Sequence, residues 1–288
     1  MEARGGKGEC PCFLFSILQN DYINRGIKVE QKKQLLINRV KNNKNELLED
    51  SIIVEYPLTI FLNNNEFVTL LCSPTGLEYL IIGFLISEGI IRNKEEIENI
   101  KIDEEKGHAY IDIKDKTLFA EKLFGKRTIT TGCGKGTVFY NVLDSLGTKS
   151  IKNNFKIGAN MVLDFSRQLN QDSILFLETG GVHSCALCDN DEIILFHEDV
   201  GRHNALDKII GEALLRDIKL EDKILITSGR ISSEMIIKTT KNGIPIVVSR
   251  SAPTDLAVKI AKQFNVTLIG FARGNRMNIY NGINRITM

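Results

Sequence analysis

Two kinds of hydrophobic pattern divide this chain into an N-terminal and a C-terminal part. Between residues 52 and 113, apolar and polar positions alternate in short runs separated by turn residues, which predicts strands joined by tight turns. From residue 173 onward, short continuous apolar runs alternate with amphipathic segments, which predicts buried strands and helices in turn. We therefore expect an α/β protein, with an α+β N-terminal domain and a C-terminal domain on a mixed, largely parallel sheet.

The N-terminal part is expected to contain a hairpin, a helix and two further strands. Residues 58–62 and 67–72 alternate on either side of an Asn63–Asn65 turn, which predicts the hairpin. Pro74 opens an apolar helical segment that ends near Gly89. The further strands are expected at residues 97–102 and 108–113. Residues 1–50 are polar and rich in Lys and Asn, and we interpret them as a weakly ordered or helical extension, because residues 29–50 carry some helical periodicity.

The C-terminal part shows a regular alternation of elements. We expect a strand at 173–177, a hairpin of 182–188 and 192–197, a helix at 204–215, and then strand, helix, strand, helix and strand at 223–227, 232–242, 244–249, 254–264 and 266–271. Gly243 and Thr254 occupy positions typical of a helix C′ residue and an N-cap. Parallel strands joined by helices have right-handed crossovers, and their ligands bind in loops at the carboxyl ends of the strands.

These patterns predict four segments. They are a polar extension (1–50), an α+β N-terminal domain (51–126), a glycine-rich loop and helix (127–147) and the C-terminal domain (148–288). No apolar run is long enough to span a bilayer, and the first residues lack the apolar stretch and cleavage site of a secretory signal, so a cytoplasmic protein is expected.

Composition adds little until charge is followed along the chain. The 288 residues include 37 Lys plus Arg and 36 Asp plus Glu, and 43% are hydrophobic, which excludes collagen-like, coiled-coil and largely disordered proteins. The net charge of +1 is a cancellation, however. Residues 223–276 hold nine basic and two acidic residues, a net +7, whereas residues 1–222 carry −7. A concentrated positive field indicates an anionic ligand, although a solvated basic face also fits the composition.

Three successive loops at the carboxyl ends of the expected strands each supply arginine. They are Ser228-Gly229-Arg230, Arg250-Ser251-Ala252-Pro253 and Ala272-Arg273-Gly274-Asn275-Arg276. Arginine makes bidentate, charge-assisted hydrogen bonds to phosphate, and helix N-termini follow two of the loops. We therefore predict a phosphate-binding site at this edge of the sheet.

The segment around Cys133 is the candidate reactive centre. Gly132 and Gly134 flank this cysteine and leave its thiol uncovered, and residues 137–146 read as a helix that begins just after it. Nearby Lys135 and Arg127, together with a helix N-terminus, would favour the thiolate. A flexible interdomain loop with an incidental cysteine is the alternative. The Gly-Lys pair lacks the spacing of a phosphate-binding P-loop, which we reject.

Two further clusters are less specific. His183, Cys185 and Cys188 could contribute to a zinc site, but no fourth ligand is apparent, and buried strand cysteines fit better. The run from His197 to Lys208 is denser in polar residues than helix capping requires, so it suggests the lining of a polar ligand site. Its candidate contacts are Asp199, Arg202, His203 and Asn204, and a solvated helix start explains the run equally well.

Together these motifs resemble the FdhD family of formate dehydrogenase accessory sulfurtransferases. TTGCGKG, ETGGVHSCAL, HEDVGRHNALDK and TSGRISSEM carry the resemblance, which covers residues 52–288. It implies a three-layer C-terminal domain similar to the cytidine deaminase fold but without zinc. It also implies a homodimer and two partners, a cysteine desulfurase and the apo-formate dehydrogenase, with no nucleic acid and no membrane.

The resemblance further implies a sulfur carrier with sulfurtransferase activity. Cys133 would accept sulfane sulfur as a persulfide and pass it to the molybdenum (or tungsten) bis-molybdopterin guanine dinucleotide cofactor, which GDP would mimic. The family often has a CxxC in this loop, but the second position here is Gly136. The stretch 271–276 matches the family's cofactor-binding segment. The candidate cofactor contacts are Phe271, Ala272, Arg273, Gly274, Asn275, Arg276, Ser228, Gly229, Arg230, Arg250, Ser251, His203 and Asn204.

Two readings from other classes remain open at the level of sequence. One is a chaperone that binds the cofactor and delivers it without carrying sulfur. The other is a zinc-dependent, deaminase-like hydrolase, which the fold alone suggests. However, His197-Glu198 does not match the H-x-E pattern of zinc deaminases, and no P-C-x-x-C follows it.

Overall fold

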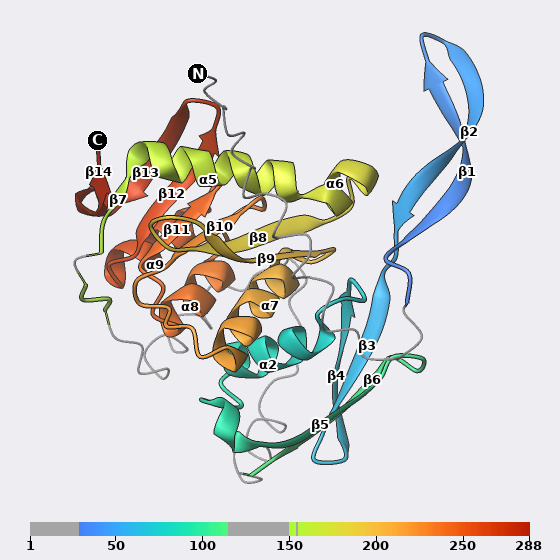
Figure 1. The fold of residues 1–288 in the computed structure, drawn as a ribbon, viewed down its shortest axis with the longest axis horizontal. Helices are drawn as coiled ribbons and strands as arrows, with labels where there is room; N and C mark the ends of the chain where they lie inside the picture. The colour runs from blue at the N-terminus through green and yellow to red at the C-terminus, as the bar shows by residue number, and fades with distance from the viewer. Residues whose placement is uncertain (1–28, 115–149, 154) are drawn as a thin grey trace, which may run out of the picture.

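A computed structural model of the chain describes residues 29–114, 150–153 and 155–288. Figure 1 shows two sheets, each packed against helices, and a two-stranded hairpin that projects away from both. The α/β class is as predicted, with an α+β N-terminal part and a larger C-terminal part.

The N-terminal sheet has the strand order β4-β3-β6-β5. Its elements are β3 (Tyr56–Leu62), β4 (Asn65–Cys72), α2 (Leu77–Glu88), a short 3₁₀ helix (Lys94–Glu96), β5 (Ile97–Asp103) and β6 (His108–Ile113). The predicted hairpin is confirmed, and its turn residues Asn63 and Asn64 both have positive φ, 49° and 66°. Apolar residues of β3, β4 and β6 pack against Leu77, Leu80, Ile81 and Leu85 of α2 to form the core of this part.

The C-terminal sheet has six strands in the order β13-β12-β11-β10-β8-β9. The strands are β8 (His183–Cys188), β9 (Ile193–Asp199), β10 (Ile224–Thr227), β11 (Ile246–Ser249), β12 (Thr267–Arg273) and β13 (Arg276–Asn281). The central strands β10, β11 and β12 are parallel, and their neighbours β8 and β13 pair antiparallel, so the sheet is mixed.

Helices cover both faces of this sheet, which gives the expected three layers. One face packs against α5 (Ala159–Asp172), and the other packs against α7 (Arg202–Leu215), α8 (Ser233–Lys241) and α9 (Asp255–Gln263). The central strands are buried on both faces because apolar side chains alternate between the two cores: Leu225 and Val247 face α7–α9, and Ile226 and Val248 face α5. Strands β7 (Ile157–Gly158) and β14 (Ile286–Thr287) and a 3₁₀ helix (Ile283–Arg285) complete the domain.

The expected helix ends are confirmed by their geometry. Thr254 caps α9 by accepting the backbone N–H of Ala257 with its side chain. Gly243 follows α8 with φ of 76°, a left-handed conformation that glycine adopts without steric cost.

Two predictions about secondary structure are wrong. Residues 32–53 form an antiparallel hairpin of β1 (Lys32–Lys41) and β2 (Lys44–Ile53), not a helical or weakly ordered extension, and the predicted boundary at residue 50 falls within β2. Asn42 and Asn43 make its turn with φ of 52° and 58°. Residues 174–179 form the short helix α6 (Ile174–Thr179), not a strand. Both oxygens of the Glu198 carboxylate accept backbone N–H groups at its start, from Leu175 and Phe176.

Helix α2 joins the two parts because it packs directly on α7. Two glycines allow this close approach. A Cβ on Gly83 would lie 1.8 Å from the carbonyl oxygen of Asp207, and a Cβ on Gly211 would lie 2.0 Å from that of Tyr79. The backbones of the two helices therefore meet where side chains would otherwise separate them, and the two parts form one continuous body in Figure 1.

Candidate functional site

A pocket of about 500 Å³ lies at the carboxyl ends of the central strands, where the sequence predicts a ligand. The loops after β10 and β11 and the end of β12 contribute Ser228, Arg250, Ser251, Phe271 and Arg273, all of them predicted contacts. The sequence did not predict the other five lining residues, which are Asn170, Ser173, Phe176, His183 and Ser184. These come from α5, α6 and β8, which pack beside the predicted loops.

Three serines that line the pocket are joined by hydrogen bonds. The Ser173 and Ser184 hydroxyls lie 2.6 Å apart, and the Ser228 hydroxyl accepts the backbone N–H of Ser184 at 3.0 Å. Ser173 also donates to the carbonyl of Leu169, one turn earlier in α5. The fixed hydroxyls provide hydrogen-bonding groups for a polar ligand.

Two arginines give the pocket its charge. Arg250 donates from Nη1 to the carbonyl of Ser166 at 3.0 Å, which fixes its direction, and the Arg273 guanidinium lies 5.8 Å from the centre of the Phe271 ring. Burial and the neighbouring Arg273 charge lower the pKa of Arg250. Among the described residues, no carboxylate pairs with either arginine. Two nearby cations without an acidic partner favour an anionic ligand.

Phe271 lies in a strained conformation beside these arginines. Its φ is 53°, in the left-handed region that a bulky residue rarely adopts, and the strand is irregular between Gly270 and Arg273. A hydrogen bond from the Phe271 N–H to the carbonyl of Ser251, 3.0 Å long, holds the backbone there. Strain of this kind often marks a functional position, and here it places an aromatic ring at the pocket.

The remaining residues of the predicted 271–276 segment have other positions. Ala272 is fully buried, and its carbonyl accepts the Ser166 hydroxyl. Arg273 and Arg276 are paired across a tight turn formed by Gly274 and Asn275, and all four are exposed. The segment is therefore the end of one strand and the start of the next. Only Phe271 and Arg273 of these residues line the pocket.

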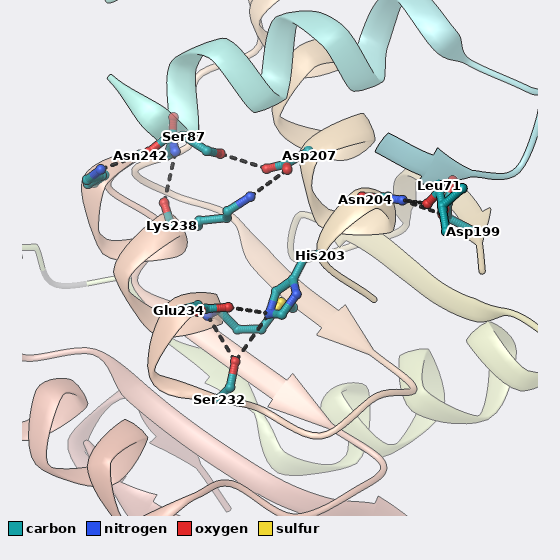
Figure 2. Close-up of polar contacts among 12 residues, drawn as sticks. Leu71, Ser87, Asp199, His203, Asn204, Asp207, Ser232, Glu234, Lys238 and Asn242 are labelled. Atoms are coloured by element: carbon teal, nitrogen blue, oxygen red, sulfur yellow. Dashed lines mark hydrogen bonds and ion pairs between the residues drawn. The ribbon is translucent and has the colours of Figure 1, made fainter. Parts of the chain in front are cut away.

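Four polar side chains of the run from His197 to Lys208 form hydrogen bonds with the N-terminal part, namely those of Asp199, Asn204, Asp207 and Lys208. Asp199 and Lys208 form a fully buried ion pair of 2.6 Å, and Asp199 also accepts the backbone N–H of Ser73. Asn204 donates to Asp199 and to the carbonyl of Leu71 (Figure 2). The prediction that Asp199 and Asn204 face a ligand is not supported by these contacts, because both side chains are engaged within the protein, by the N-terminal part and by their own domain.

His203 lies outside the pocket, in the first turn of α7, and its ring contacts the start of α8. Its Nε2 is 3.3 Å from the Ser232 hydroxyl and 3.3 Å from a carboxylate oxygen of Glu234 (Figure 2). Burial, together with the Arg202, Lys238 and His183 charges, lowers the pKa of His203 to about 3. A neutral ring that donates one hydrogen bond fits this setting.

The cysteines of the described residues are buried. Cys72, Cys185 and Cys188 are free, and burial raises the pKa of Cys72 to about 12 and that of the other two further above the usual value. Such thiols are weak nucleophiles at neutral pH. The described ranges contain no group of three or more His, Cys, Asp or Glu side chains placed to hold a metal ion.

The predicted reactive residue, Cys133, and the segment 127–147 lie outside the described residues. Their assignment therefore rests on the sequence. No helix in the described part of the chain is long and apolar enough to cross a membrane.

The fold and the site define an α/β protein with a cationic, aromatic ligand pocket at the strand ends of a three-layer domain. Comparison with known proteins shows which class this is: a family model for the FdhD/NarQ family matches residues 53–287, and the chain belongs to that family. The predicted resemblance is confirmed.

Relatives with curated names cover most of the chain. The sulfur carrier protein FdhD of Bacillus pumilus is 45% identical over 89% of this chain and 98% of its own length, and that of Bacillus subtilis is 44% identical over 83% and 91%. Among solved structures, a candidate formate dehydrogenase accessory protein from Desulfotalea psychrophila superposes with a TM-score of 0.74 at 27% identity. This match covers 90% of our chain and all of that one.

Proposed function

We propose that this protein is a sulfur carrier that serves the maturation of a formate dehydrogenase. Membership of the FdhD/NarQ family supports this, as do the names of relatives that span nearly the whole chain. The structural neighbour, described as a formate dehydrogenase accessory protein, supports the same role. A cysteine desulfurase, the apo-dehydrogenase and a second copy of the chain are the proposed partners.

In the proposed reaction Cys133 carries the sulfur. Its thiolate attacks the terminal sulfur of the desulfurase persulfide, a new S–S bond forms on Cys133, and the desulfurase cysteine leaves as a thiolate. Release of that sulfur as sulfide, the form that binds a metal, requires two electrons, which an external dithiol supplies as it becomes a disulfide. The buried Cys72, Cys185 and Cys188 do not compete for this role, because their pKa values are raised.

The acceptor is the molybdenum or tungsten bis-molybdopterin guanine dinucleotide cofactor, which the protein holds as cargo. The observation that carries this proposal is the pocket itself. Arg250 and Arg273 suit phosphate groups, the Phe271 ring suits the face of a guanine, and the serine hydroxyls offer hydrogen bonds to polar edges.

Mass spectrometry tests the role of Cys133. After incubation with a cysteine desulfurase and cysteine, the intact protein should gain one sulfur atom, and peptide mapping should place it on Cys133. Cys133→Ala should gain none, whereas Cys188→Ala, which changes a buried thiol, should load normally. Sulfur loading of Cys133→Ala to the wild-type level would refute the assignment.

Titration with GDP tests the pocket. Arg250→Gln and Arg273→Gln should each weaken GDP binding about ten-fold or more, since a hydrogen bond to a charged group contributes about 1.5–3 kcal/mol. Arg216→Gln is the matched control, because Arg216 is exposed and pairs with Glu212 away from the pocket. Equal GDP affinity in all four proteins would exclude the pocket as the nucleotide site.

The same measurements separate the carrier from a chaperone that only delivers cofactor. A chaperone would bind GDP in the pocket and support the dehydrogenase, but Cys133 would not acquire sulfur. Retention of formate dehydrogenase activity with Cys133→Ala would favour that alternative.

A further inference from the structure

A second group of basic side chains lies beside the pocket. Arg202 begins α7, Arg230 follows β10, and His183 begins β8. The position that a Cβ on Gly229 would occupy is 3.2 Å from Cβ of Arg202 and 3.3 Å from Nδ1 of His183, so these two side chains meet over a glycine backbone. Arg202 and Arg230 do not line the pocket, whereas His183 does.

The charges of this group are not balanced within the described structure. Nε of Arg202 is buried without a hydrogen-bond acceptor, and neither Arg202 nor Arg230 pairs with a carboxylate anywhere in the described ranges. The acid whose charge acts on His183 is Asp199, which is engaged by Lys208 and by the Ser73 N–H. A buried guanidinium nitrogen without an acceptor is costly, and because no described carboxylate offsets the charge of either arginine, an anion bound at the group would offset it.

The local electrostatics point the same way. The pKa of His183 is lowered by burial and then by Arg202 and Arg230, which outweigh the opposite effect of Asp199. The group also lies at the N-terminal end of α7, a helix of 14 residues whose N-cap is Gly201 and which has no side-chain cap. The helix dipole adds partial positive charge there.

We propose that Arg202, Arg230 and His183 form a second anion-binding subsite, adjacent to the pocket, that takes a phosphate group. Because His183 belongs to both, one ligand could place one anionic group in the pocket and another in this subsite. The link to a nucleotide ligand rests on the proposed function, whereas the affinity for phosphate does not.

Inorganic phosphate tests the subsite once the pocket has been disabled. In the Arg250→Gln, Arg273→Gln background, calorimetry should still detect one phosphate site. Adding Arg202→Gln or Arg230→Gln should weaken that site about ten-fold or more, and adding Arg216→Gln should not. Arg230 is exposed, so its variant should fold normally even if the Arg202 variant does not.

Histidine resonances give an independent readout, because the chain has only four histidines. Phosphate bound in the subsite should raise the pKa of His183 in the pocket-disabled background, since it offsets the Arg202 and Arg230 charges. The proposal fails if that background binds no phosphate, or if the Arg202 and Arg230 variants bind it within two-fold of the background.

Competition between GDP and inorganic phosphate in the wild-type protein shows which phosphate group occupies the subsite. Displacement of inorganic phosphate from the subsite by GDP would identify the nucleotide's own phosphate as its occupant. Simultaneous binding would assign the subsite to a phosphate group beyond GDP. Both results support the subsite. If GDP does not bind while phosphate does, the proposed function of the pocket fails and the subsite stands.

Discussion

At the scale of single residues, the arginines differ in how the fold holds them. The Arg250 guanidinium is tied to the Ser166 carbonyl, and that of Arg273 lies over the Phe271 ring. Arg202, by contrast, has a buried nitrogen with no acceptor in the described part of the chain. The fold thus orients the pocket cations in advance and leaves the neighbouring cation without a counter-charge.

His203 predicts a pH dependence of stability. Its pKa is about 3 in the folded protein and about 6.5 when unfolded, so the unfolded state binds more protons between these values. The contribution of His203 to the free energy of unfolding is therefore fully present above about pH 6.5, and it is lost as the pH falls toward 3. This residue should account for about 1 kcal/mol of loss between pH 7 and 5.5.

Urea unfolding at both pH values measures this effect. His203→Gln should reduce the loss between pH 7 and 5.5 by about 1 kcal/mol, because glutamine keeps a hydrogen bond to Ser232 or Glu234 without titrating. An unchanged loss in the variant would contradict the assignment.

Five of the ten residues that line the pocket could be predicted because they directly follow recognisable strands in the sequence. Arg250, Ser251, Ser228, Phe271 and Arg273 follow continuous apolar strands, and parallel strands bring their carboxyl ends to one edge. Asn170, Ser173, Phe176, His183 and Ser184 reach the pocket through packing of α5, α6 and β8, which no local pattern reveals. His183 was noted in the sequence, but as a possible zinc ligand beside Cys185 and Cys188 and not as a pocket residue.

At the scale of elements, the errors arise where distant contacts decide the structure. The apolar run 174–177 has the composition of a strand. It forms the helix α6 because the carboxylate of Glu198, in β9, accepts the backbone N–H groups of Leu175 and Phe176 at the start of the helix. Gly180, with φ of 65°, ends the helix. Strands β1 and β2 have no fully buried residue, so the alternation that usually identifies strands is absent. The Asn42-Asn43 pair, which is typical of a two-residue hairpin turn, was the one feature of the sequence that could have indicated this hairpin.

The contact between α2 and α7 makes a prediction for Gly83. Gly83→Ala should lower the free energy of unfolding by about 3 kcal/mol, since its Cβ would collide with the Asp207 carbonyl and force the helices apart. The gain in helix propensity, about 1 kcal/mol, is too small to compensate.

Gly158→Ala is the matched control for this substitution. Gly158 has φ of −69°, and the nearest atom to an added Cβ is Thr287 Oγ1 at 3.9 Å, so its effect should stay within about 0.5 kcal/mol. Chemical denaturation measures both variants. Equal stabilities of the two variants would show that the helices can separate without cost.

At the scale of the whole molecule, a buried ion pair of the C-terminal domain lies at its contact with the N-terminal part, where Asp199 accepts the Ser73 N–H and Lys208 donates to the Ser73 carbonyl. Asp199→Asn and Lys208→Met should each destabilise the protein by about 3–5 kcal/mol, because each leaves its partner charged and buried. The double variant should lose clearly less than the two single losses together, since it removes both charges.

A double-mutant cycle measured by urea unfolding checks this coupling. The exposed pair of Lys259 and Asp255, 3.4 Å apart, is the control and should show coupling below about 0.5 kcal/mol. Additive losses for Asp199 and Lys208 would mean that the two buried charges do not stabilise each other.

The projecting hairpin of β1 and β2 should be locally much less stable than the central strands of the C-terminal sheet. Each strand has ten residues and is about 33 Å long, the base of the hairpin contacts Glu178 and Gly181, and Leu36, Val40 and Leu47 are exposed on one face. An isolated pair of strands is only marginally stable, whereas β10 and β11 are buried along their whole length. Amide protons of β1 and β2 should therefore exchange with deuterium far faster than those of β10 and β11. The hairpin can open and re-form many times while the domain that holds the pocket stays closed.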